Sequence, residues 1–274
     1  MASILLVVHP ERPAAWQLAS TARKWWENQG REVIEVRRAE EAAAFGADDG
    51  VEFAVSLGGD GTMLRTVDLV LGASVPVLGV NLGRMGYLTA VEPSGIEPAF
   101  ERMLVGDYFV EERMALEVEL TGSSPGTFTA LNDAIVERTE PGHTVHVAVD
   151  ISGRPFLTYL ADGILVATPT GSTAHNLSAR GPVLSPLLQA IILTPVSPHM
   201  LFDRSLVLER TEEVRLTVVD DSDAAAVIDG ARVIRLRLGD SVLCRPAANP
   251  ARLISFGIRD FHAKLRHRFG LTDR

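Results

Sequence analysis

The first hundred residues alternate short, unbroken apolar runs with helical patterns. The apolar runs, which are typical of buried strands, cover residues 4–8, 33–36, 53–57 and 75–80. The helical patterns cover residues 13–28, 39–44, 62–71 and 96–103. Pro13 in the first turn and Gly30 just past the end mark the first of these helices. Unbroken apolar strands separated by helices predict a Rossmann-like α/β domain, in which a parallel sheet is covered on both faces.

Beyond residue 110 the pattern changes to an alternation of apolar and polar positions. Leu116, Val118 and Leu120 alternate with acids, and the same period recurs farther along the chain. The later alternating segments cover residues 143–151, 215–219 and 233–238. Short alternating strands separated by turn residues predict a β-rich, sandwich-like domain with antiparallel strands.

Helical patterns are sparse in this second part. They are limited to residues 172–179 and 186–191, and a basic, amphipathic stretch at residues 261–269 predicts a closing helix. The change of pattern predicts two domains, residues 1–110 and residues 111–254.

Composition excludes some classes of function. With 46% hydrophobic and 22% charged residues, the 274-residue chain is typical of a globular protein. Its net charge of −9 provides no basic field to attract nucleic acid or an anionic membrane. We therefore expect neither nucleic acid nor a membrane as a partner.

The cysteine count and the N-terminal residues bear on disulfide bonding and cellular location. Cys244 is the only cysteine, which excludes an intramolecular disulfide. The apolar run at residues 4–8 is too short for a signal core or a membrane span, and no basic segment precedes it. We expect a cytoplasmic location. Histidines are scattered without cysteines or acids at metal-ligand spacing, so no metal held by protein side chains is predicted.

The stretch LGGDGTML, residues 57–64, places a single carboxylate, Asp60, among glycines directly after a predicted strand. Open α/β sheets bind ligands at such turns, where backbone N–H groups favour phosphate oxygens. The stretch lacks the Lys-Ser/Thr of a Walker A loop and the third glycine of the dinucleotide fingerprint. An acid beside phosphates opposes their binding unless it deprotonates an attacking hydroxyl. An ordinary tight turn is the alternative.

Hydroxyl side chains crowd the turn TPTGSTA, residues 168–174, which follows a predicted strand at residues 164–167. Four hydroxyls in six residues suit hydrogen bonds to ribose, phosphate or an amide. The alternative is that Ser172 or Thr173 caps the following helix.

A third polar feature interrupts the apolar stretch ALNDAIVER, residues 130–138. Adjacent strand positions face opposite sides, so Asn132 or Asp133 should enter an interior or a site. A bulge or turn is the alternative reading of this pair.

Together these stretches resemble the NAD kinase family. The resemblance rests on GGDGT at residues 58–62, the Asn-acid pair at 132–133, DG at 162–163 and TPTGSTA at 168–174. Supporting matches are NLGRMGYLT at 81–89, LTPVSPHML at 193–201 and DG at 229–230. The resemblance covers residues 51–260. GGDGT alone is shared with lipid kinases such as the diacylglycerol and sphingosine kinases.

The resemblance implies an organisation and an activity. The first domain would be an α/β nucleotide-binding domain to which residues 255–274 return, and residues 111–254 would form the β-rich NAD-binding domain. The implied reaction is ATP-dependent phosphorylation of the adenosine ribose 2′-hydroxyl of NAD, which gives NADP. A divalent metal, usually Mg²⁺, would arrive with the ATP phosphates. The family forms homo-oligomers, which are dimers or tetramers.

The family's functional positions in the first domain fall on the glycine stretch. Asp60 matches the catalytic proton acceptor, and Gly59, Gly61 and Thr62 match its substrate-binding neighbours. Arg65 stands where the family often places a basic contact.

The remaining matched positions lie in the second domain. Asn132 and Asp133 match the pair that holds the adenosine part of NAD, and Asp162 matches an acid on the nicotinamide side. His143 matches a second basic contact. The segment that closes over the substrate corresponds to Thr173, Ala174, His175, Asn176, Leu177 and Ser178.

Five residues depart from the family's usual pattern. They are Asp133 in place of Glu, His175 in place of Tyr, Arg180 in place of Gly, Ser185 in place of His and Ala231 in place of Gln. These departures leave the catalytic stretch intact and bear on substrate preference, NAD or NADH or another nucleotide. ATP, another triphosphate and polyphosphate all remain open as the phosphoryl donor.

Two other functions compete with the kinase interpretation. A lipid kinase with GGDGT should carry a hydrophobic lipid-binding cleft or a membrane-facing basic patch, and neither is evident in the sequence. A non-catalytic dinucleotide sensor would gain nothing from a carboxylate beside phosphates, so the retained Asp60 argues against it.

Overall fold

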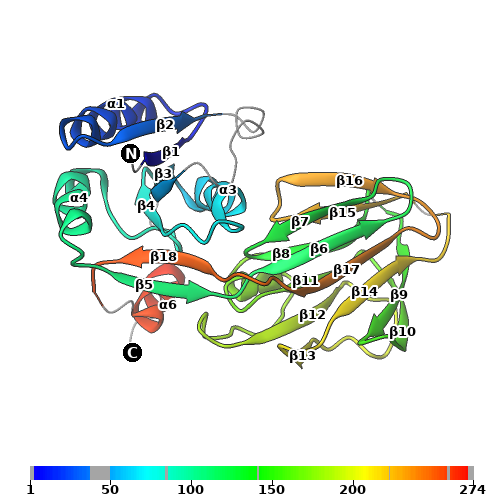
Figure 1. The fold of residues 1–274 in the computed structure, drawn as a ribbon. Helices are drawn as coiled ribbons and strands as arrows, with labels where there is room; N and C mark the ends of the chain where they lie inside the picture. The colour runs from blue at the N-terminus through cyan, green and yellow to red at the C-terminus, as the bar shows by residue number, and fades with distance from the viewer. Residues whose placement is uncertain are drawn as a thin grey trace. The chain divides into compact units, whose positions relative to one another are not determined.

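The computed structural model describes residues 3–37, 50–83, 86–140, 142–221, 223–257 and 260–270. The chain divides into two compact units (Figure 1). Unit 1 comprises Met1–Glu112 and Ala251–Arg274, and unit 2 comprises Arg113–Pro250. The chain thus leaves the first unit once and returns to it near its end.

A six-stranded sheet forms the centre of unit 1. Its strands are β1 (Ser3–Val8), β2 (Glu32–Val36), β3 (Val51–Gly58), β4 (Val77–Asn81), β5 (Phe109–Arg113) and β18 (Ala251–Ser255). They lie in the order β2-β1-β3-β4-β18-β5. β1 pairs in parallel with β2 and β3, and β4 pairs in parallel with β3 and β18. Every residue of β1 is buried, as its unbroken apolar run predicts.

Unit 1 also contains helices, which lie along the chain between and after the strands of this sheet. They are α1 (Pro13–Asn28), α3 (Asp60–Val70), the 3₁₀ turn η1 (Pro93–Gly95), α4 (Ile96–Leu104) and α6 (Phe261–Phe269). α1 buries Ala15, Ala19, Ala22 and Trp26 at helical spacing against the sheet. Trp26 is fully buried and Trp25 only partly, because consecutive residues do not share one helix face.

The closing helix is confirmed as α6, which belongs to unit 1. The helix expected at residues 39–44 lies outside the described residues. No helix in the described ranges combines the length and apolar character needed to cross a membrane.

Two antiparallel, six-stranded sheets form unit 2. The first has the order β10-β9-β14-β17-β6-β7 and consists of β6 (Leu116–Thr121), β7 (Gly126–Ala130), β9 (Val145–Ile151), β10 (Arg154–Ala161), β14 (Val214–Val218) and β17 (Ser241–Pro246). The second has the order β13-β12-β11-β8-β15-β16 and consists of β8 (Asp133–Arg138), β11 (Gly163–Ala167), β12 (Ala190–Val196), β13 (Leu206–Glu209), β15 (Ala224–Ile228) and β16 (Arg232–Leu236).

One hydrophobic core lies between these two sheets. Leu116, Val118 and Leu120 enter it from the first sheet, and Ile164 and Val166 enter it from the second. The alternating apolar positions are therefore the inward-facing residues of a sandwich, and the predicted α/β plus β-rich fold is confirmed.

Of the two predicted helices of unit 2, the one at residues 172–179 is confirmed only in part, and the one at residues 186–191 is wrong. Residues 171–178 form a 3₁₀ turn, η2 (Gly171–Thr173), and a single turn of α-helix, α5 (His175–Ser178), with a break at Ala174. Residues 186–191 form a turn that leads into β12. Ile191 and Leu193 are buried there in the sandwich core, so tertiary burial decides the conformation of this apolar run.

Candidate active site

The glycine stretch of unit 1 joins β3 to α3, and Asp60 is the first residue of the helix. A Cβ on Gly58 would lie 2.1 Å from Oγ1 of Thr62, so packing against the helix requires this glycine. A Cβ on Gly59 or Gly61 would meet no protein atom within 4 Å. These two glycines therefore leave open space on both sides of Asp60, and the turn has room for an approaching ligand.

Backbone N–H groups fix the Asp60 carboxylate. Its Oδ2 accepts a hydrogen bond from the N–H of Tyr87 at 3.0 Å, and its Oδ1 accepts one from the N–H of Leu88 at 3.1 Å. A Cβ on Gly86 would lie 2.1 Å from Oδ1, so the chain approaches the carboxylate as closely as only glycine allows. The position of the carboxylate is thus set by a segment 27 and 28 residues away in sequence.

The closing helix supports this segment. Nζ of Lys264 on α6 lies 3.4 Å from the carbonyl oxygen of Tyr87 and 3.3 Å from that of Thr89 and donates to both. The sequence did not single out Lys264. Its only signal was the basic, amphipathic pattern of the tail.

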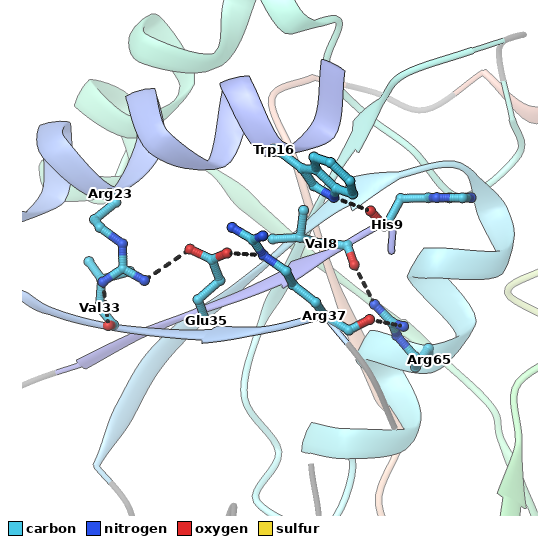
Figure 2. A network of polar contacts seen from close by, with 8 residues as sticks. All are labelled: Val8, His9, Trp16, Arg23, Val33, Glu35, Arg37 and Arg65. Atoms are coloured by element: carbon cyan, nitrogen blue, oxygen red, sulfur yellow. Dashed lines mark hydrogen bonds and ion pairs between the residues drawn. The ribbon is translucent and has the colours of Figure 1, made fainter. Parts of the chain in front are cut away.

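Arg65 lies on α3, five residues after Asp60, and its side chain is drawn in Figure 2. Its guanidinium donates to the carbonyl oxygens of Val8 at 2.7 Å and Arg37 at 2.8 Å. The arginine therefore joins the helix of the glycine stretch to the carboxyl ends of β1 and β2.

In unit 2 the Asn-acid pair lies at the start of β8, where Asp133 is the first strand residue. The carboxylate of Asp229 organises the backbone here. It accepts hydrogen bonds from the N–H groups of Leu131, Asn132 and Asp133 at 2.9, 2.8 and 3.1 Å. Asp229 has φ of 48°, in the left-handed region that aspartate tolerates better than most residues. Sequence reasoning noted Asp229 only within a family match and gave it no role.

Asp133 is buried, with 4% of its surface exposed. The pKa of this carboxyl is raised to about 7: burial is the largest cause, the charge of the nearby Asp229 adds to it, and a hydrogen bond from the backbone N–H of His175 opposes it. Asp133 thus enters the interior, as one member of the pair was expected to do. Its shifted pKa in a polar loop is typical of functional carboxyls.

The TPTGSTA turn is bound to the same loop. Thr168 donates from Oγ1 to the carbonyl of Leu131 at 2.6 Å, and its N–H donates to the carbonyl of Asn132 at 2.9 Å. A Cβ on Gly171 would lie 2.0 Å from that same carbonyl oxygen, which requires glycine at this contact. The two polar stretches of unit 2 therefore form one structure.

The hydroxyls of this turn mainly stabilise its own backbone. Ser172 donates to the carbonyl of Pro169 at 2.7 Å and accepts from the N–H of Leu184 at 3.0 Å. Thr173 donates to the carbonyl of Thr170 at 3.3 Å. Neither hydroxyl caps α5, so the capping alternative is wrong.

The segment from Ala174 to Ser178 contains side chains in two kinds of environment. Asn176 is fully buried: its amide donates to the carbonyl of Pro182 at 2.9 Å and accepts from Thr194 Oγ1 at 2.7 Å. The His175 ring and the Ser178 hydroxyl are exposed, and Thr173, Ala174 and Leu177 are half-buried. Asn176 therefore supports the turn, whereas His175 faces outward, where a ligand can reach it.

Arg180 follows in a conformation that glycine favours. Its φ is 63°, in the left-handed region, where this chain has arginine instead of the family's usual glycine.

Asp162 and His143 lie away from the Asp133 loop within unit 2. β11 pairs antiparallel with β8 so that Ala167 lies opposite Asp133, and Asp162 precedes the other end of β11. There Asp162 accepts a hydrogen bond of 2.8 Å from Nε of Arg138. His143 is exposed in the turn before β9. Within one chain, the structure does not bring these two residues beside Asp133.

No group of three or more His, Cys, Asp or Glu side chains in the described ranges is placed to hold a metal ion.

Comparison with known proteins follows the same division of the chain. The family model described as the ATP-NAD kinase N-terminal domain matches residues 16–108, and that described as the ATP-NAD kinase C-terminal domain matches residues 131–256. An NAD kinase of Heliobacterium modesticaldum is 40% identical over 280 residues, which span 98% of this chain and 98% of the relative. An NAD kinase of Moorella thermoacetica is 37% identical and covers 98% of this chain and 89% of its own.

Solved structures share the fold. A yeast NADH kinase complexed with NADH has a TM-score of 0.86 at 22% identity and covers 100% of this chain and 89% of its own. An NAD kinase from Archaeoglobus fulgidus in complex with ATP has a TM-score of 0.75 at 25% identity, over 97% of both chains. The chain therefore belongs to the NAD kinase family, as the resemblance of its motifs implied.

Proposed function

We propose that this enzyme transfers a phosphoryl group from ATP to the adenosine ribose 2′-hydroxyl of NAD and so makes NADP. The observation that carries the proposal is the placement of Asp60. Asp60 lies at the start of α3, between two glycines that leave open space. Its carboxylate is fixed by the backbone N–H groups of Tyr87 and Leu88.

Asp60 acts as the general base in this proposal. A ribose hydroxyl is a poor nucleophile until its proton leaves, and a carboxylate can accept that proton. A carboxylate offers about four lone-pair positions, and the N–H groups of Tyr87 and Leu88 use two of them. The remaining positions are available to the hydroxyl. The N–H groups thus hold the base in place and leave part of its accepting capacity for the substrate.

The loop of unit 2 recognises the adenosine part of NAD. Asn132 and Asp133 supply polar side chains at the start of β8, and the exposed ring of His175 offers a stacking surface. Because the pKa of Asp133 is raised to about 7, its carboxyl can donate as well as accept a hydrogen bond near pH 7. Ribose hydroxyls and adenine nitrogens can use both roles.

The remaining assignments follow from family membership. Mg²⁺ would be held by the donor phosphates, where it would neutralise their charge. We place the enzyme in the cytoplasm as a homo-oligomer, a dimer or tetramer, without nucleic acid or membrane partners. The net charge of −9 supports the last point. We place Asp162 on the nicotinamide side of the substrate and assign His143 as a basic contact.

The two competing functions are not favoured. Relatives that match nearly the whole chain are NAD kinases, which argues against a lipid kinase. A sensor would have no use for the fixed Asp60 carboxylate beside open space.

A coupled assay of NADP formation tests the proposal. The purified enzyme is given NAD with ATP, with other triphosphates or with polyphosphate, and then NADH in place of NAD. NADP formation with ATP, strongly reduced in the Asp60→Asn variant, is the expected result. Absence of NADP formation with ATP would overturn the proposal.

A further inference from the structure

A group of basic side chains lies in unit 1 near the carboxyl ends of β1 and β2, beside the glycine stretch. We call His9, Arg12, Arg37 and Arg65 the basic cluster; three of them are drawn in Figure 2. Parallel strands bring it together, because His9 directly follows β1 and its N–H donates to the carbonyl of Leu57 on β3 at 3.0 Å. The cluster therefore lies at the carboxyl ends of parallel strands, where open α/β sheets bind their ligands.

Arg12 connects the cluster to the glycines. Its Nη1 donates to the carbonyl of Leu82 at 2.8 Å, and the N–H of Leu82 donates to the carbonyl of Gly58 at 2.8 Å. Gly83 lies against the guanidinium, since a Cβ there would be 2.9 Å from Nη1. Arg12 is thus held two hydrogen bonds away from the turn that contains Asp60.

His9 presents a donor. Its Nδ1 accepts a hydrogen bond from the N–H of Glu11 at 3.2 Å, so the neutral ring carries its hydrogen on Nε2. In the described part of the chain, Nε2 has no hydrogen-bond partner. Trp16 fixes the backbone here by donating from Nε1 to the carbonyl of His9 at 3.2 Å.

The cluster carries more positive than negative charge. Glu35 lies between Arg37 and Arg23 and is shared by both (Figure 2). Arg12 forms no ion pair with a carboxylate in the described ranges. Burial lowers the pKa of His9. The positive charges of Arg12 and Arg65 lower it further, and only the charge of Glu11 raises it. A proton on His9 is therefore disfavoured by neighbouring cations, as expected at a place built for an anion.

We propose that His9 and Arg12, supported by Arg37 and Arg65, bind the phosphate chain of the phosphoryl donor. This rests on the proposed function, and it names the residues that hold the donor rather than NAD. The Asp60 carboxylate repels phosphates directly in front of it, so cations beside the turn must hold them. A triphosphate with about four negative charges needs more cations than the pyrophosphate of NAD with two.

The kinetic test compares Arg12→Gln with wild type. Loss of a charged hydrogen bond should raise the KM for ATP about tenfold or more, with the KM for NAD changed less than twofold. Arg31→Gln is the matched control, because Arg31 pairs with Glu52 near the starts of β2 and β3. It should change neither constant. A raised KM for NAD alone, or an unchanged KM for ATP, would overturn the proposal.

A binding test separates this proposal from the proposed function. The imidazole of His9 is followed by NMR while ATP, tripolyphosphate or adenosine is added to the enzyme without NAD. ATP and tripolyphosphate should raise the pKa of His9, because they bring negative charge to its Nε2, and adenosine should not. If tripolyphosphate binds as tightly as ATP, the cluster recognises the phosphate chain itself.

The outcomes of the two tests are distinguishable. An ATP-dependent shift of His9 in an enzyme that makes no NADP would leave the donor site standing and refute the function. Normal NADP formation with no effect of phosphates on His9 would refute the donor site alone.

Discussion

Asp133 and Asp229 are joined by two reciprocal hydrogen bonds. The N–H of Asp133 donates to Oδ1 of Asp229 at 3.1 Å, and the N–H of Asp229 donates to the carbonyl of Asp133 at 2.9 Å. Three backbone N–H groups stabilise the ionised carboxylate of Asp229, whereas Asp133 is buried and has a raised pKa. The two carboxyls therefore have different roles: Asp229 holds the negative charge and orders the loop, and Asp133 keeps its proton up to about neutral pH.

This division predicts a pH dependence of stability. Unfolded Asp133 loses its proton near 3.8 and folded Asp133 near 7, so the folded state binds more protons between these values. The free energy of unfolding of wild type should fall, relative to that of Asp133→Asn, as pH rises from about 4 to 7, and the difference should level off above 7. Urea unfolding at pH 5, 6, 7 and 8 measures it. Parallel curves for the two proteins would contradict the raised pKa.

Asp229→Asn should lower the pKa of Asp133. The amide keeps one oxygen for the N–H groups of Asn132 and Asp133 and removes the neighbouring like charge. Carbon-13 NMR titration of the Asp133 carboxyl should give a value below that of wild type. Asp221→Asn, which removes an exposed charge, should leave the titration unchanged. An unaltered pKa in Asp229→Asn would show that burial alone raises it.

His175→Tyr should be tolerated in NAD binding. The ring is exposed on α5, and a tyrosine there offers a larger stacking surface. Aromatic stacking contributes on the order of 0.5–1.5 kcal/mol beyond burial, so the KM for NAD should stay equal or fall up to about tenfold. If NAD binding is lost in a folded variant, the histidine must instead make a specific hydrogen bond.

Sequence reasoning located the elements and motifs that depend on local pattern. The helix predicted at residues 13–28 is α1 (Pro13–Asn28), because proline, apolar spacing and the following glycine all agree. The predicted helix at residues 172–179 is confirmed only as the short α5 (His175–Ser178), because Ser172 and Thr173 donate hydrogen bonds to nearby carbonyls, a competition that composition alone does not decide.

The supporting residues were beyond local pattern. Asp229 accepts hydrogen bonds from residues 96 to 98 positions away in sequence, and Lys264 donates to carbonyls 175 and 177 positions away. Only the fold brings such partners together. Polar residues such as these are ordinary in a turn or a terminal helix, so the sequence gives no reason to select them.

Lys264→Met should lower kcat about two- to tenfold. The lysine donates to the carbonyls of Tyr87 and Thr89, and the N–H groups of this segment hold the Asp60 carboxylate. One hydrogen bond contributes a net 0.5–1.5 kcal/mol, roughly a factor of two to ten, and its loss should loosen the segment rather than remove a substrate contact. Steady-state kinetics should show the KM for NAD unchanged. Lys24→Met, an exposed position on α1, is the control and should match wild type.

The last prediction concerns Asp60 itself. Asp60→Asn is similar in size but accepts no proton, and its amide can accept from only one of the two N–H groups that Tyr87 and Leu88 present. Its kcat should fall by roughly 10²–10⁴, the usual contribution of a general base, while calorimetry shows NAD binding within a few-fold. Gly86→Ala keeps the carboxylate but places a Cβ 2.1 Å from Oδ1, so it should lower kcat by displacing the base. Near-normal turnover of Asp60→Asn would show that Asp60 is not the base. A loss of NAD binding alone would make it a substrate contact instead.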